Sequence, residues 1–225
     1  SSENEVTNII NHSESKVLFV AKKMVGKVSK EVMEKMTLVI ELDTLEIIKA
    51  DEEKFTCDGR TAVPTPDEIA TIIYTSGTTG NPKGMLYSHR STVLHSYGII
   101  MPDSLNVSAR DIMLPVVPMF HVNAWGTPYA AAMVGCSLVL PGPGLDGASL
   151  VSLIDTYKVS VALGVPTIWQ GLISAATQSG SKLESLKRNV VGGSACPPTM
   201  LKAFKEQFNC ETIHAWGMTE TSPLG

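Results

Sequence analysis

The sequence predicts an α/β fold in which alternating strands and helices form mostly parallel sheets flanked by helices. Short apolar, β-branched runs recur along the 225 residues. Longer segments with helical apolar spacing separate these runs, and several open with proline or with Ser, Thr or Asp. Strands that alternate with helices favour parallel pairing, with helices on both faces of the sheet.

Each element is placed by its own run of residues. Strands are expected at Lys16–Ala21, Thr37–Leu42, Ile69–Thr75, Asp111–Pro115, Ser137–Leu140, Val159–Leu163, Asn189–Val191 and Glu211–His214. Helices are expected at Lys22–Lys35, Ser88–Met101, Val122–Met133, Ala148–Tyr157, Pro166–Ala176 and Pro197–Phe208. Because ligands of open parallel sheets bind beyond the carboxyl ends of the strands, function is expected in the loops after the strands.

Composition and charge exclude several classes of function. The chain has 18 basic and 22 acidic residues, and its net charge of −4 argues against a broad surface for nucleic acid or an anionic membrane. No apolar run approaches the roughly 18 residues that span a bilayer. The four cysteines form no C-x-x-C pair, which argues against a zinc site or a disulfide framework and favours a reducing, cytoplasmic setting.

A glycine-rich run directly after a predicted strand has the composition of a polyphosphate-binding loop. It extends from Thr75 to Gly84 and reads Thr-Ser-Gly-Thr-Thr-Gly-Asn-Pro-Lys-Gly. Glycines let backbone N–H groups approach an anion closely, hydroxyls can donate to phosphate oxygens, and Lys83 adds positive charge. The nearest alternative is the P-loop of kinases and GTPases, but Pro82 replaces its second glycine and Gly84 its Ser/Thr.

The run from Tyr74 to Gly84 resembles the signature Y-T-S-G-T-T-G-x-P-K-G of the adenylate-forming superfamily, and it matches every fixed position. That superfamily includes acyl-CoA synthetases, peptide-synthetase adenylation domains and firefly luciferase. The resemblance implies that the loop grips the β- and γ-phosphates of ATP and is mobile. The implied nucleotide contacts are Thr75, Ser76, Gly77, Thr78, Thr79, Gly80 and Lys83, with Lys83 also a catalytic residue.

A second motif follows the last predicted strand and resembles the Y-G-x-T-E motif of the same superfamily. Trp216 stands where the family often has tyrosine, and it keeps an aromatic face on which adenine can stack. The resemblance implies that Glu220, a hard oxygen donor, is the Mg²⁺ ligand and that the Thr219 hydroxyl contacts the α-phosphate. Trp216, Gly217 and Thr219 are then nucleotide contacts, and Thr219 and Glu220 are catalytic.

The segment Val190–Pro197 also follows a strand, and two interpretations are open. The first is the nucleophile elbow G-x-S-x-G of α/β-hydrolases, but Cys196 occupies the position of the last glycine, and Glu211 and His214 lie in a single strand. The second is similarity to the G-G-(A/S/E) segment with which the adenylate-forming family lines its adenine pocket. It makes Gly193, Ser194 and Ala195 nucleotide contacts.

The segment Pro115–Gly126 resembles the family's P-x-F-H motif, in which the histidine and its neighbours lie at the acyl-substrate pocket. The histidine follows a strand and opens a predicted helix on the ligand side of the sheet. A structural role for it is the alternative. The expected pocket residues are Phe120, His121, Val122 and Trp125, and the apolar side chains here favour a fatty or other apolar acid.

The motifs together imply ATP-dependent activation of a carboxylic acid to an acyl-adenylate, followed by transfer to coenzyme A. ATP, Mg²⁺ and coenzyme A are the implied cofactors and co-substrates. An amino-acid-type adenylation domain stays open within the family, although the Phe120-His121 segment has no acidic residue to hold an ammonium group. A P-loop-like phosphotransferase stays open outside the family.

The resemblance covers the middle of a family member. Residues 1–110 are expected to belong to a first α/β subdomain with the ATP loop, and residues 111–225 to a second one with the acyl and adenine motifs. The chain opens without methionine, and by the resemblance it is expected to lack the family's small C-terminal domain with its catalytic lysine. We therefore expect a fragment that binds ATP weakly at best, with unpaired strand edges that favour a homodimer or swapped association.

Overall fold

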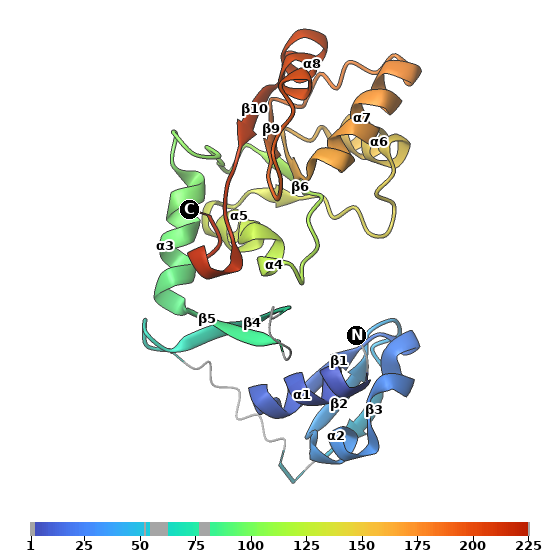
Figure 1. The fold of residues 1–225 in the computed structure, drawn as a ribbon, viewed down its shortest axis with the longest axis vertical. Coiled ribbons are helices and arrows are strands. Elements are labelled where there is room, and N and C mark those ends of the chain that lie inside the picture. Colours follow the sequence, from blue (N-terminus) through green and yellow to red (C-terminus); the bar gives the residue numbers. More distant parts are fainter. Residues whose placement is uncertain (1–2, 52, 55–62, 77–81, 225) are drawn as a thin grey trace. The chain divides into compact units, whose positions relative to one another are not determined.

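The computed structural model describes residues 3–51, 53–54, 63–76 and 82–224. The chain forms two compact units (Figure 1). One unit comprises residues 1–65 and 72–86, and the other comprises residues 66–71 and 87–225. The subdomain boundary expected at residue 110 stays a prediction.

The first unit contains a small mixed sheet. Its elements are α1 (Glu3–Ser13), β1 (Val17–Val20), the 3₁₀ helix η1 (Lys22–Lys27), α2 (Lys30–Lys35), β2 (Leu38–Glu41) and β3 (Ile47–Ala50). β1 pairs with β2 in parallel, and β3 pairs with β2 antiparallel. The buried core residues are Ile10, Val20, Val32, Met36 and Val39.

The helix expected over Lys22–Lys35 is in fact two short helices, η1 and α2. Val28 between them is extended, with φ −89° and ψ 119°. Ser29 then caps α2, because its hydroxyl accepts a hydrogen bond from the Val32 N–H. A local side-chain cap therefore interrupts what the apolar spacing alone presents as one helix.

Strands β4 (Ile69–Thr75) and β5 (Lys83–Ser88) form a separate two-stranded sheet, and each contributes residues to both units. The sequence patterns do not predict β5, nor do they predict α1 and β3. α1 is a polar helix whose one buried residue is Ile10, so its apolar signal is weak.

The second unit is built on a five-stranded sheet with the order β10-β9-β8-β6-β7, and every pair in it is parallel. This arrangement confirms the predicted α/β class. The elements are α3 (His89–Ile100), β6 (Ile112–Pro115), α4 (Val122–Trp125), α5 (Thr127–Val134), β7 (Ser137–Leu138), α6 (Gly147–Tyr157), β8 (Val161–Gly164), α7 (Pro166–Ser179), β9 (Arg188–Val191), α8 (Pro198–Phe208), β10 (Glu211–His214) and the 3₁₀ helix η2 (Thr219–Thr221).

Two apolar cores cover the two faces of this sheet, because successive strand residues point to opposite sides. Leu114 belongs to the core shared with α6, α7 and α8, and its neighbour Met113 belongs to the core shared with α3 and α5. Val190 and Val191 divide between the same two cores. Figure 1 shows α6, α7 and α8 gathered together within this unit.

A nearly buried ion pair connects the amino ends of β6 and β9. Arg188 Nη2 lies 2.5 Å from Asp111 Oδ1, and the two side chains are 13% and 10% exposed. Ser160 Oγ donates to the same Asp111 oxygen at 2.8 Å, and the Ser108 N–H donates to the other at 2.9 Å. Burial alone would raise the pKa of Asp111, but the hydrogen bonds and the Arg188 charge lower it overall.

None of the helices in the described ranges is both long and apolar enough to cross a bilayer.

Candidate functional site

The loops that follow β6, β8, β9 and β10 lie at one edge of the five-stranded sheet. The strands are parallel, so their carboxyl ends share that edge. Backbone hydrogen bonds continue the ladder into the loops, from Gly192 N to Gly164 O and from Ala215 N to Val191 O. The motifs that follow β6, β9 and β10 therefore begin at the same edge of the sheet, where ligands of such sheets bind.

The acyl-pocket motif contains a left-handed turn. Residues 122–126 all have φ between +49° and +72°, and four of the five are not glycine. The helix expected over Val122–Met133 is therefore wrong in its first turn, and the right-handed helix α5 starts at Thr127. Left-handed backbone costs about 1–2 kcal/mol for each ordinary residue, so packing must hold this turn in place. Strain of this kind gathers at functional sites, and apolar spacing gives no sign of it.

The four predicted pocket residues differ in accessibility. Phe120 is 87% exposed and His121 is also exposed, whereas Val122 and Trp125 are buried. Trp125 packs against the segment after β9, since a Cβ added to Gly192 would lie 2.7 Å from its ring. The turn thus joins the acyl motif to the segment expected to contact adenine.

The segment after β9 offers its backbone to solvent. Gly193 adopts φ +78°, which favours glycine, and Gly193, Ser194 and Ala195 are all exposed. Within the described residues no histidine is hydrogen-bonded to Ser194, and His214 lies on the neighbouring strand β10 in register with Val191. The local geometry suits backbone contacts to a ligand better than an activated serine.

The motif after β10 forms the short helix η2. The Met218 N–H donates a hydrogen bond to Thr221 Oγ1 at 3.1 Å and to the Pro223 carbonyl at 2.9 Å. Thr219 is nearly buried, while the Glu220 carboxylate is exposed and Trp216 is 64% exposed. A metal ion or a base could reach Glu220 and Trp216 directly.

Tyr87, which the sequence patterns do not single out, anchors this turn. Its hydroxyl donates to the Thr219 carbonyl at 2.5 Å. Burial, and then the negative charge of Glu220, raise the pKa of Tyr87 to about 12, so the phenol stays protonated and remains a donor. No motif surrounds Tyr87, and only the fold brings it to a residue so distant in sequence.

Of the run from Thr75 to Gly84, the structure describes the two ends: Thr75 and Ser76, and Pro82 to Gly84. The expected contacts Gly77, Thr78, Thr79 and Gly80 lie outside the described residues. Thr75 ends β4 and Lys83 begins β5, with the lysine side chain exposed. The loop therefore joins two adjacent strands.

This topology disagrees with the P-loop alternative, in which the lysine opens a helix. Here Lys83 opens a strand, and helix α3 begins later, at His89. Gly84 also has a packing role at the position of the P-loop Ser/Thr, because a Cβ there would come within 2.9 Å of the Ile72 side chain on β4.

The base of the phosphate loop contacts α1. Tyr74 OH and His12 Nδ1 are 2.7 Å apart, and the two rings meet edge to face. Tyr74 and Pro82 also line a pocket of roughly 390 Å³ with α1 residues. The sequence gives His12 no metal-ligand spacing and favours a surface or structural role for it, and its link to the loop is visible only in the fold.

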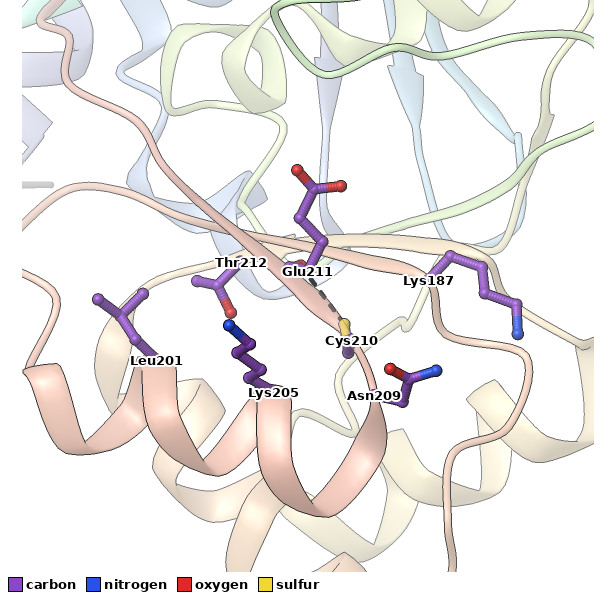
Figure 2. Close-up of a pocket in the computed structure, with 7 residues that line it drawn as sticks. All are labelled: Lys187, Leu201, Lys205, Asn209, Cys210, Glu211 and Thr212. Carbon is purple, nitrogen blue, oxygen red and sulfur yellow. Dashed lines mark hydrogen bonds between the residues drawn. The ribbon is translucent and has the colours of Figure 1, made fainter.

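A different pocket lies at the amino ends of β9 and β10, away from the predicted site residues. Its volume is roughly 460 Å³, and Figure 2 shows the residues that line it: Lys187, Leu201, Lys205, Asn209, Cys210, Glu211 and Thr212. Burial, and then nearby Glu211, raise the pKa of Cys210 to about 12, so its thiol is not a poised nucleophile. We assign no function to this pocket.

The whole chain, residues 1–225, matches the family model described as AMP-binding enzyme. A medium-chain-fatty-acid–CoA ligase of Ectopseudomonas oleovorans is 67% identical over 159 residues, which cover 71% of this chain and 29% of that protein. A 3-methylmercaptopropionyl-CoA ligase of Ruegeria pomeroyi is 49% identical over 98% of this chain and 43% of its own length.

The fold is similar to an inhibitor-bound crystal structure of the N-terminal domain of FACL13 from Mycobacterium tuberculosis. The TM-score is 0.82 and the identity 26%, over 99% of this chain and 55% of that one. The chain spans less than half the length of the two curated relatives. These findings confirm the resemblance inferred from the motifs: the chain belongs to the AMP-binding enzyme family, and its relatives there include acyl-CoA ligases.

Proposed function

We propose that this chain is the ATP-binding core of an enzyme that converts a carboxylic acid first to an acyl-adenylate and then to an acyl-CoA thioester. The observation that carries the proposal is the joint occurrence of two features in a chain related to CoA ligases. One is the complete phosphate-loop signature from Tyr74 to Gly84. The other is the set of three motifs at the carboxyl edge of the parallel sheet.

The chemistry needs no nucleophilic side chain. A carboxylate oxygen of the acid attacks the α-phosphorus of ATP, and the bond to the oxygen that bridges the α- and β-phosphates breaks, releasing pyrophosphate. The thiol of coenzyme A then attacks the acyl carbonyl carbon, loses its proton to solvent, and displaces AMP. The protein must align the two substrates and stabilise the charge that develops on the pyrophosphate.

The residues available for this task have distinct proposed roles. Lys83 and the hydroxyls of Thr75 and Ser76 bind the β- and γ-phosphates, together with residues 77–80. Thr219 contacts the α-phosphate. The exposed backbone of residues 193–195 and the exposed ring of Trp216 bind adenine, with Gly217 beside them.

Glu220 fits the role of a Mg²⁺ ligand. Its carboxylate is exposed, and one carboxylate combined with substrate phosphates is a typical magnesium environment in proteins. When bound, the ion neutralises charge on the phosphate oxygens. No group of three or more His, Cys, Asp or Glu residues that could hold a metal occurs in the described ranges, so the phosphates would supply the remaining ligands.

The proposed acid is apolar and of medium chain length. The segment around Phe120 and His121 carries Val122 and Trp125 and no acidic side chain that would hold an amino-acid ammonium group. The relative that is 67% identical is named for medium-chain fatty acids. Both observations favour a fatty acid over an amino acid.

Acid-dependent exchange of labelled pyrophosphate into ATP tests the proposal in the full-length protein. We expect exchange with fatty acids of about six to twelve carbons, and little with amino acids, because a hydrocarbon tail matches apolar surface. Glu220→Gln should reduce the exchange rate by about two orders of magnitude through lost charge stabilisation. Glu211→Gln, a matched carboxylate-to-amide change at the opposite edge of the sheet, should leave it unchanged.

The alternatives have different signatures in the same assay. An amino-acid adenylation domain would exchange pyrophosphate with amino acids and not with fatty acids. A P-loop phosphotransferase would release ADP and show no exchange. Either pattern would contradict the proposal.

Two finer expectations belong to this proposal. The described cysteines are Cys136, Cys196 and Cys210, and all three are free thiols, which supports a cytoplasmic location. The edge strands β7 and β10 have an open side within their sheet, which supports a homodimer or swapped association. Sedimentation at several concentrations would reveal an entirely monomeric protein if association is absent.

A further inference from the structure

His95, on the middle of α3, contacts the left-handed turn of residues 122–126. Its Nε2 lies 3.0 Å from the Trp125 carbonyl oxygen. Because a carbonyl can only accept, Nε2 carries the proton and donates. Burial lowers the pKa of His95, although the hydrogen bond to Trp125 partly raises it, so a neutral ring provides the donor at neutral pH.

The same ring packs on the last residue of the turn. A Cβ added to Gly126 would lie 2.5 Å from His95 Cδ2 and 2.7 Å from Nε2. Glycine is favoured at position 126 for two reasons: its φ is +72°, and the His95 ring leaves no space for a side chain. His95 therefore restricts the conformation of the turn in two ways, by a hydrogen bond to Trp125 and by van der Waals contact with Gly126.

Apart from the bond to His95, the turn has few hydrogen bonds to distant elements in the described part of the chain. Among the described residues, its remaining hydrogen bonds are short-range, such as those from Gly126 N to the carbonyls of Val122 and Asn123 and from Thr127 Oγ1 to the Ala124 carbonyl. Bonds of this range close the turn but do not attach it to the rest of the unit. The attachment comes from His95 and from the packing of the buried side chains of Val122, Ala124 and Trp125.

Trp125 connects the turn to the segment after β9 that is expected to contact adenine. Its ring fills the space above Gly192, which begins the loop after β9. We propose, on the basis of the function proposed above, that His95 is a positioning residue for acid activation. It holds the strained turn so that Trp125 stays on Gly192 and the Phe120-His121 segment stays at the acid site.

Three variants of the full-length protein test this inference. His95→Leu fills similar space without a donor, and His95→Gln restores an N–H donor. His89→Leu is the matched control, because His89 lies on the same helix and its side chain forms no hydrogen bond among the described residues. Hydrogen exchange of the peptide covering residues 119–127 is measured first, and it does not depend on activity.

We expect His95→Leu to speed exchange in this peptide by about tenfold, as follows from loss of one hydrogen bond, with α7 unchanged. His95→Gln should return the rate close to that of the wild type. In the pyrophosphate assay, His95→Leu should raise the KM for the acid by about tenfold with a smaller change in the KM for ATP, and His95→Gln should recover it.

Several results would overturn the inference. The first two are hydrogen exchange in residues 119–127 that is equal in His95→Leu and wild type, and hydrogen exchange that is faster throughout the second unit. The other two are equal behaviour of the His95→Leu and His95→Gln variants, and failure of His95→Leu to fold when His89→Leu folds. The last would make His95 a structural residue. A wild-type protein that shows no acid-dependent exchange of pyrophosphate into ATP would refute the proposed function instead. The hydrogen-exchange comparison would still decide whether His95 holds the turn.

Discussion

Gly192→Ala is the substitution whose consequence the structure specifies most directly. Gly192 does not need glycine for its backbone, because its φ lies outside the left-handed region. It needs glycine for space. A Cβ there would lie 2.7 Å from Trp125 Cη2 and 3.2 Å from Cζ2 and Cζ3.

The size of the effect follows from these separations. The Trp125 ring would have to withdraw by about 0.7 Å to restore an ordinary contact of 3.4 Å. The ring is buried and belongs to a turn held by His95, so it cannot move freely. Overpacking of this kind costs about 1–3 kcal/mol, which corresponds to a fall in Tm of roughly 2–12 °C for a chain of this length.

A double-mutant cycle with Trp125→Phe isolates the clash. Phenylalanine removes the ring atoms that the new methyl group would meet, so Gly192→Ala should cost about 1–3 kcal/mol less in that background. Thermal unfolding of the four proteins measures the difference. Gly98→Ala is the control, because a Cβ there meets nothing within 4 Å in helix α3, and it should stabilise by about 0.5–1 kcal/mol.

Equal costs of Gly192→Ala in the wild-type background and in the Trp125→Phe background would refute the reasoning. So would a Gly192→Ala protein as stable as the wild type. Either result would mean that the indole does not occupy the space above Gly192 in solution.

Two further predictions concern polar contacts. Asp111→Asn should destabilise by about 3–5 kcal/mol at pH 7, because it leaves the nearly buried guanidinium of Arg188 without the opposite charge of Asp111. Since folding lowers the pKa of Asp111, its contribution is present above about pH 4 and is lost as pH falls through the folded pKa, so urea unfolding should show a smaller difference between variant and wild type near pH 3. Tyr87→Phe should cost about 0.5–1.5 kcal/mol by removing the bond to the Thr219 carbonyl and should raise the KM for ATP, whereas Tyr157→Phe, at an exposed tyrosine, should change neither. Identical urea midpoints and KM values for the Tyr87 and Tyr157 variants would contradict the anchoring role.

Much of the larger sheet could be predicted from sequence because its central strands, β6, β8 and β9, are short and largely apolar runs buried on both faces. Helices such as Pro166–Ser179 carry their own apolar periodicity, with proline at the start and glycine just after the end. β5 escaped prediction because its residues, Lys83–Ser88, are only partly apolar and follow a run that is typical of a loop. The start of the helix predicted at Val122 is wrong because the left-handed conformation of the turn depends on contacts with His95 and Gly192, which are distant in the chain.

The sequence by itself determined the family and the residue types of the candidate site, because a run such as Thr75–Gly84 is a local pattern that the chain carries whatever its fold. Only the tertiary structure decided the partners of those residues. Tyr87 beneath Thr219 and His95 on Trp125 join segments far apart in sequence, and each contact depends on where the sheet and its helices place the side chains. Motifs are local, whereas positioning depends on long-range packing, and long-range packing leaves no periodic signal in the sequence.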